Sequence, residues 1–527
     1  MRKLLLATAA IMGASGGLAY AQTLPANPSQ GQLIAPYGAG PAKDNNNNAW
    51  GVANTPSGSA AAGQLSTIFA PNTVAVPTPG TVVIRLNGRV EVEVAGTFSN
   101  LNTGVNLATK AQPLGSPNGY KLNPVGVSSY LRLYPGFDGL SANGIRYGAS
   151  AEIRENFYAG TTGTVNGGST GAFASPQGNA SAQTLYVRQA FTYLATDQAG
   201  IIRLGQGSGV LSLFDNCIFT SQCWDGGLGA LNGAGLGDVG PSGTQPPFVW
   251  LNTAGAEVAN NKIVYLSPQF FGFDFGVQYA PSAGNAFANA SGSVPFQSAP
   301  CNQAGPNCIN VSSGNDATRW FNQVGGGLRY QQTFGAVDVK LYGFGETAQK
   351  ENLTTGPYST AAAQRAIARA TYNGVAGSTG QGSAMALRYQ NLGFYKAGGA
   401  ITFANFTAAL DYIGGAVNGQ LNLVPEGGSN MNALLPGLTY ANGPLIAGVQ
   451  FGEIWSQGDA RLAGVSQRHE YELALGGAYK LAPGVQLVGE YQYAYRHQNG
   501  YNFAAGTIGN TVDAQSQQVL FSTVLTW

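Results

Sequence analysis

The sequence predicts an all-β protein, a transmembrane antiparallel β-barrel of about 16 strands with one constriction loop folded inward. Charged residues form only 9% of the 527-residue chain, whereas a soluble domain usually has about 25%. Aromatic residues nevertheless make up 10%, which argues against disorder. After the first 21 residues no apolar run is long enough for a membrane-spanning helix. Strands that turn one face to lipid and the other to water account for all of these features.

The first 80 residues precede the predicted barrel and divide into two parts. Residues 1–21 have the form of a secretory signal peptide, with Arg2 and Lys3 before an apolar segment and small residues before the cut. Residues 22–80 are rich in Pro, Asn and Gly and show neither strand nor helix periodicity. We expect a flexible extension here, with a folded accessory module as the alternative, and the barrel over residues 81–527.

The first predicted strand begins at Thr81 and shows which face meets water. Val82, Ile84 and Leu86 alternate with Arg85 and Asn87, a period of two that is typical of a half-buried strand. A charge facing lipid at mid-membrane would cost about 2 to 4 kcal/mol, so we expect the charged face to line the lumen.

The same alternation places seven arginines on the water-facing side of the first five strands. Taken singly, each could be a solvated residue without a role. Together they predict a basic wall, formed by Arg85, Arg89, Arg132, Arg146, Arg154, Arg188 and Arg203. Glutamates also fall on that side, which leaves the ion preference open: Glu91, Glu93, Glu152, Glu470, Glu472 and Glu490.

A long acidic stretch follows these strands and predicts the constriction loop, at about residues 207–250. No lysine or arginine occurs between Arg203 and Lys262, whereas the stretch contains Asp215, Asp225 and Asp238. Acids on the loop and arginines on the wall would set up a transverse electric field across the opening. Polar solutes can align with such a field, whereas apolar solutes must displace ordered water.

The chain ends on an aromatic residue, Trp527, and Phe521 lies on the same face of this last strand. Such an ending resembles the C-terminal assembly signal of Gram-negative outer-membrane β-barrels.

Several short motifs occur in an order that resembles the trimeric general porins of Gram-negative bacteria, closest to the proteobacterial ones. They are Pro135-Gly136-Phe137-Asp138-Gly139, Asn143-Gly144-Ile145-Arg146-Tyr147-Gly148, Arg188-Gln189-Ala190-Phe191, Arg203-Leu204-Gly205-Gln206 and Tyr265-Leu266-Ser267-Pro268. The resemblance implies a homotrimer in the outer membrane, passive diffusion of small hydrophilic solutes and ions, and no cofactor. The implied partners are outer-membrane lipid, lipopolysaccharide and the assembly machinery. Nucleic acid is not among them.

The four cysteines form two close pairs in predicted loops, Cys217 with Cys223 and Cys301 with Cys308. An even number of cysteines in an exported protein favours disulfides. Zinc binding is the alternative, but the only two histidines, His469 and His497, lie far away in the sequence. We therefore expect two disulfides and no metal site.

Other functions remain as alternatives. A substrate-selective porin for sugars or organic acids would depend on lumen aromatics such as Tyr130, Tyr134 and Trp224. An adhesin or structural protein would act through its long loops. An enzyme is not predicted, because neither histidine lies near a serine and an acid in the pattern of a catalytic site. A plugged transporter is disfavoured, because residues 22–80 are too short and irregular for a folded plug.

Overall fold

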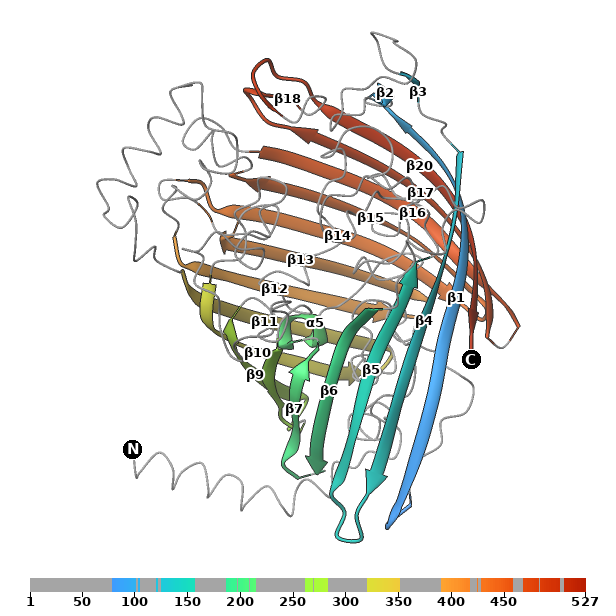
Figure 1. Ribbon diagram of the computed structural model, residues 1–527, viewed down its shortest axis with the longest axis vertical. Coiled ribbons are helices and arrows are strands. Elements are labelled where there is room, and N and C mark those ends of the chain that lie inside the picture. The colour runs from blue at the N-terminus through green and yellow to red at the C-terminus, as the bar shows by residue number, and fades with distance from the viewer. Residues whose placement is uncertain are drawn as a thin grey trace, which may run out of the picture.

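The predicted barrel is confirmed, and its described strands number sixteen. The computed structural model describes residues 78–100, 103–104, 120–121, 125–156, 186–196, 198–207, 209–214, 261–268, 270–282, 320–350, 390–417, 424, 428–457, 468–482, 484–502 and 507–527. The sixteen strands form one closed antiparallel sheet (Figure 1). They are β1 (Thr81–Ser99), β4 (Val125–Leu140), β5 (Arg146–Asn156), β6 (Tyr186–Thr196), β7 (Gly200–Gln206), β8 (Asn261–Leu266), β9 (Phe273–Ser282), β10 (Trp320–Phe334), β11 (Val337–Lys350), β12 (Leu392–Phe403), β13 (Phe406–Ala416), β14 (Met431–Asn442), β15 (Leu445–Ser456), β16 (Arg468–Ala482), β17 (Val485–His497) and β20 (Ala514–Thr526).

Neighbouring barrel strands follow one another along the chain, and β1 pairs with β20 to close the ring. The remaining described strands form two short hairpins outside the ring, β2 (Thr103–Gly104) with β3 (Tyr120–Lys121) and β18 (Tyr501–Asn502) with β19 (Thr507–Ile508). The helix α5 (Val210–Phe214) follows β7. No helix in the described ranges is long and apolar enough to cross a membrane.

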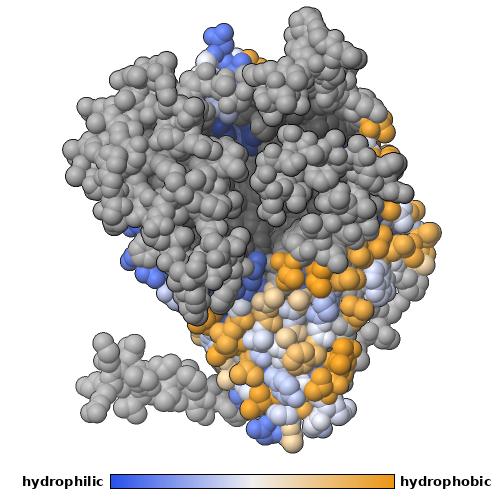
Figure 2. All heavy atoms as spheres, viewed as in Figure 1, coloured by the Kyte–Doolittle hydropathy of each residue, from blue (hydrophilic) through white to orange (hydrophobic). Residues whose placement is uncertain are grey.

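Alternation along each strand separates an apolar outer face from a polar inner face. On β1, Ile84 is 84% exposed on the outside, whereas Glu91 and Glu93 are fully buried on the opposite face. On β20, Phe521 is 64% exposed and the preceding Leu520 only 1%. Apolar residues are prominent on the visible outer surface of the barrel wall, interspersed with less hydrophobic ones (Figure 2). This division is the one predicted for charged residues, because lipid would penalise an outward charge.

The two ends of the barrel differ in the length of their connections. One end carries short turns, such as 335–336, 404–405 and 443–444, in which Gly335 and Gly443 adopt the positive φ that a tight turn requires. The other end carries the long connections, among them 157–185, 207–260 and 351–391. Trp527 and the start of β1 lie at the short-turn end.

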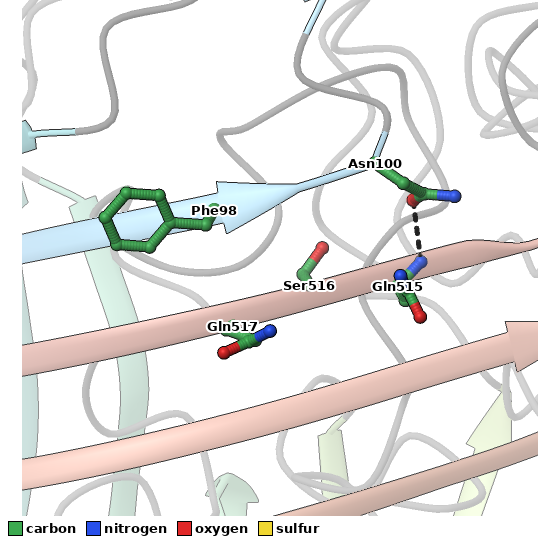
Figure 3. A pocket seen from close by; sticks show the side chains of 5 residues that line it. All are labelled: Phe98, Asn100, Gln515, Ser516 and Gln517. Carbon is green, nitrogen blue, oxygen red and sulfur yellow. Dashed lines mark hydrogen bonds between the residues drawn. The ribbon is translucent and has the colours of Figure 1, made fainter.

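The last residue closes the ring. Gly88 and Trp527 exchange two backbone hydrogen bonds of 3.2 Å, and the indole lies where a side chain at Gly88 would stand. At the long-loop end of the same seam, Asn100 donates from Nδ2 to the Asp513 carbonyl, and its Oδ1 accepts from the Gln515 backbone N–H, each at 2.9 Å. Asn100, Phe98 and Gln515 line a small pocket there together with Ser516 and Gln517 (Figure 3). Both ends of the β1–β20 seam are therefore fixed by contacts beyond the strand ladder.

Candidate functional site: the inner wall and the start of the constriction loop

The helix α5, at the start of the predicted constriction loop, lies inside the barrel. The Val210 N–H donates to Oε1 of Gln278, a buried inward-facing residue of β9, at 2.6 Å. Phe214 packs against Gly327 of β10, where a Cβ would lie 3.3 Å from its ring. Both residues are almost fully buried. The chain therefore leaves β7 at the long-loop end and turns inward to contact β9 and β10.

The carboxylate of Glu346 holds the Gln278 side chain in place next to α5. Glu346 of β11 accepts hydrogen bonds from Nε2 of Gln278, at 2.7 Å, and from Nε2 of Gln323 on β10. Because a carboxylate only accepts, these bonds fix the Gln278 amide with its oxygen toward Val210. Side chains of β9, β10 and β11 thus fix the position of the Gln278 oxygen, which accepts the hydrogen bond from the first N–H of α5.

The other end of α5 rests on a buried ion pair. Arg329 of β10 forms a bidentate pair with Asp274 of β9, the shortest N–O distance being 2.6 Å. Its guanidinium carbon lies 4.7 Å from the centroid of the Phe214 ring. The carboxylate compensates the buried charge, and the ring covers its face.

Cations of the inner wall also stack on aromatic rings elsewhere. Arg203 of β7 lies 4.2 Å from the ring centroid of Phe191 on β6. The Nζ atom of Lys396 on β12 lies 5.5 Å from the ring centroid of Tyr342 and 3.5 Å from a carboxylate oxygen of Asp411. In these places the lumen surface contains cationic side chains packed against aromatic rings.

The described inward charges are distributed unevenly around the ring. From β5 to β13 the described cations outnumber the acids, and two of the acids, Asp274 and Asp411, are in ion pairs. On β16, β17 and β1 carboxylates outnumber cations among the described side chains. The carboxylates of this second region are Glu91, Glu93, Glu470, Glu472 and Glu490, and its cations are Arg468 and Arg496.

The predicted arginine wall is described only in part. Arg203 is buried and Arg146 half-buried on the inner side of the barrel. For the other five arginines, Arg85, Arg89, Arg132, Arg154 and Arg188, the structure describes the backbone alone. The register places three of them in one row, because Arg89 pairs with Arg132 and Arg132 with Arg154.

Other predicted site residues lie outside the described residues or on the outer face. The loop acids Asp215, Asp225 and Asp238 and the cysteines Cys217, Cys223, Cys301 and Cys308 fall outside the described ranges. Phe521 and Trp527 face outward and are 64% and 46% exposed. Within the described chain no group of three His, Cys, Asp or Glu side chains could hold a metal ion.

Both histidines face outward at the long-loop end, and each contacts a carboxylate. Nε2 of His469 lies 2.8 Å from an oxygen of Glu453, and Nδ1 of His497 lies 2.6 Å from an oxygen of Asp513. The indole of Trp455 stacks on His469 with an 11° angle between the ring planes. These pairs lie on the side of the wall opposite to the lumen.

A comparison with protein families gives the identity. Residues 7–499 match the family model described as Gram-negative porin. The chain belongs to this family. Membership agrees with the predicted resemblance, the outer-membrane location and a passive diffusion channel.

Solved structures similar to this porin are distant in sequence. The anion-selective porin of Comamonas acidovorans is 14% identical, with a TM-score of 0.46, over 85% of this chain and 100% of its own. OmpT of Vibrio cholerae is 10% identical, with a TM-score of 0.44, over 86% and 100%. The channel DcaP of Acinetobacter baumannii is 11% identical, with a TM-score of 0.44, over 86% and 100%. Among curated proteins there is no match.

Sequence reasoning missed several cations that line the lumen of this porin, four of them on β8 to β12. Lys262, Arg329, Lys340 and Lys396 lie on β8, β10, β11 and β12, are at most 4% exposed, and point inward. The signal was present, since each alternates with apolar neighbours as the earlier arginines do. The predicted basic wall contains only arginines of the first five strands.

Proposed function

We propose that this porin is a general diffusion channel in which α5 and the loop after it narrow a charged, water-filled lumen. The observation that carries the proposal is the attachment of α5 to the inner wall through Val210 and Phe214. A wall with interspersed charges attracts water and polar solutes, whereas an apolar solute must displace that water. Passage needs no tight binding, so transport follows the concentration gradient.

The selectivity of the channel depends in this proposal on the arginine row facing acids of the loop. The row formed by Arg89, Arg132 and Arg154 supports it through the strand register. Loop acids Asp215, Asp225 and Asp238 would form the opposite side of the field. The buried glutamates of β16, β17 and β1 add a second negative region. Anions can therefore pass along the arginine row and cations along the glutamates.

The decisive experiment measures the conductance and zero-current potential of the purified chain in planar bilayers under a salt gradient. Replacing Arg85, Arg132 and Arg146 together with glutamine removes three positive charges from the wall, so we expect the zero-current potential to shift toward cation selectivity. Large ohmic current steps are expected for the unmodified chain. An unchanged potential in the triple variant would contradict the proposed arginine wall.

Two alternatives predict different results in the same apparatus. A substrate-selective porin would show saturable block by its sugar or organic acid, and inward aromatics such as Tyr134 and Tyr342 favour this reading. An adhesin would show no conductance. We infer no catalytic role, because the chain belongs to a family of porins and both histidines lie on the outer face of the barrel.

We also propose a homotrimer, cleavage after Ala21 and the two disulfides Cys217–Cys223 and Cys301–Cys308. Non-reducing peptide mass mapping of the mature protein tests the last two points together. Free thiols at these positions would rule out the disulfides. Chemical cross-linking in membranes tests the trimer.

A further inference from the structure

The acid-rich part of the inner wall contains a cluster of polar side chains on three neighbouring strands. The register places Gln450 of β15, Ala474 of β16 and Gln492 of β17 in one row across the sheet. Glu472 points inward two residues from Ala474 on the same strand, so it is the diagonal neighbour of both glutamines. We call Gln450, Glu472, Glu490 and Gln492 the acceptor cluster.

Three oxygen atoms of the acceptor cluster have no hydrogen-bond partner among the residues that the structure describes. They are Oε1 of Gln450, Oε1 of Glu472 and Oε1 of Gln492. Their side chains are only 4%, 3% and 2% exposed. A buried polar atom without a partner costs free energy, so this arrangement calls for a ligand that supplies donors.

The orientation of the Gln492 amide is fixed by its neighbour. Its Nε2 donates to Oε1 of Glu490 at 2.6 Å. Since a carboxylate can only accept, the amide nitrogen must face Glu490 and the amide oxygen must face away from it. The unpaired oxygen of Gln492 is therefore a true acceptor and not an exchanged nitrogen.

The surrounding charges favour a cation. Glu472 and Glu490 lie within electrostatic range of each other, so a cation at the cluster would meet two carboxyl groups. The next inward residue along β16, Glu470, is already paired with Arg496 of β17. Glu472 has no such cationic partner within the described chain. An anion would be repelled here.

The residues on either side of Glu472 and between the two glutamines are small, whereas Gln492 has Gln518 of β20 on its other side. Gly452 and Ala494 pair with Glu472 on either side, and Ala474 separates the two glutamines. No side chain at these positions can reach the three oxygens. A metal ion is a poor occupant, because the described residues provide no group of three metal-binding side chains.

We propose that the acceptor cluster is a binding site for primary ammonium groups, such as those of alkyl diamines and amino sugars. A protonated primary amine carries three N–H donors, a positive charge and no acceptor, which matches three acceptor oxygens, one of them from Glu472, with Glu490 as a second carboxylate nearby. The site rests on the proposed channel function and refines it, since amines would pass along the wall formed by β15, β16 and β17. It gives the channel a preference within the class of small polar solutes.

The test titrates 1,4-diaminobutane onto the full chain in planar bilayers and measures the concentration that halves the single-channel current. The comparison solute is 1,4-butanediol, which has similar length and no charge. We expect the diamine, but not the diol, to block. In E472Q the half-blocking concentration should rise about tenfold or more, because a charge-assisted hydrogen bond is lost. In Q450L, which leaves the charge unchanged, we expect a rise of severalfold.

The matched control is E453Q, which removes a carboxylate from the outer face of the same wall. Glu453 pairs with Tyr471, the residue next to Glu472 on β16, so the two glutamates lie at similar height on opposite faces. We expect E453Q to be blocked like the unmodified chain. Equal block of E472Q and the unmodified chain would overturn the proposal, as would equal weakening in E453Q or equal block by the diol.

A calorimetric titration of the refolded chain in detergent with the same diamine separates this proposal from the channel function. Binding that is lost in E472Q and kept in E453Q supports the amine site even for a chain that does not conduct. A chain that conducts but neither binds the diamine nor is blocked by it refutes the amine site alone.

Discussion

Gly88 and Trp527 show how single residues close a barrel of this size. The indole occupies the space that any side chain at position 88 would need, and the two backbones exchange hydrogen bonds. The indole can take this position because residue 88 has no side chain. The terminal tryptophan is thus a structural part of the β1–β20 seam.

Replacing Gly88 with valine tests this contact. The new side chain must displace the indole, so we expect a loss of about 1 to 3 kcal/mol in the free energy of unfolding from lipid vesicles. The control is G343V on the outer face of β11, where a Cβ meets nothing within 4 Å. There a β-branched residue should be neutral or stabilising. Equal urea midpoints for the two variants would contradict the sealing role.

The helix α5 is the element that connects the barrel wall to the constriction. One end is held by the Gln278 amide and the other by the Phe214 ring on Arg329. Both partners lie on strands that follow the loop in sequence. The loop can therefore take its anchored position only after β9 and β10 have joined the sheet.

Truncating Phe214 to alanine should release α5 from the wall without opening the barrel. Loss of a buried phenylalanine side chain costs about 3 to 5 kcal/mol. Here that cost weakens the attachment of α5 to the wall and leaves the pairing of the barrel strands intact. We expect increased open-channel current noise in planar bilayers and an unchanged unfolding midpoint. The control F275A removes an outward ring from β9, and should leave the noise unchanged. Quiet channels in F214A would show that other contacts hold the loop.

The strands were predictable from the sequence, but the position of α5 was not. Alternation is local, so Val82, Ile84 and Arg85 already reveal which face of β1 meets water. The contact between Val210 and Gln278 joins residues that are 68 positions apart. It depends on the register of several strands around the ring. The same holds for the wall of seven arginines. Alternation predicts which face of a strand an arginine occupies, but it does not predict the distance from that arginine to groups across the lumen.

At the scale of the whole molecule, sixteen strands create two surfaces with opposite requirements. The inner face tolerates the cations Lys262 and Lys396, because Lys262 donates to the Gly207 carbonyl and Lys396 contacts Asp411 and the Tyr342 ring. The outer face has few charged positions, and Glu453 lies near the long-loop end, where the membrane gives way to water. Whether a strand position can hold a charged side chain therefore depends on whether it faces lipid or the lumen.

Adjacent lysine substitutions at the middle of β20 measure this difference directly. Val519 is 40% exposed on the outer face, whereas Gln518 is fully buried on the inner face. A lysine at 519 must enter the hydrocarbon layer, so we expect a loss of about 2 to 4 kcal/mol in folding free energy. A lysine at 518 faces the lumen near the glutamates of β1 and β17, and should lose less. Urea titration of both variants in vesicles compares them, and a larger loss for Q518K than for V519K would invert the assignment of the two faces.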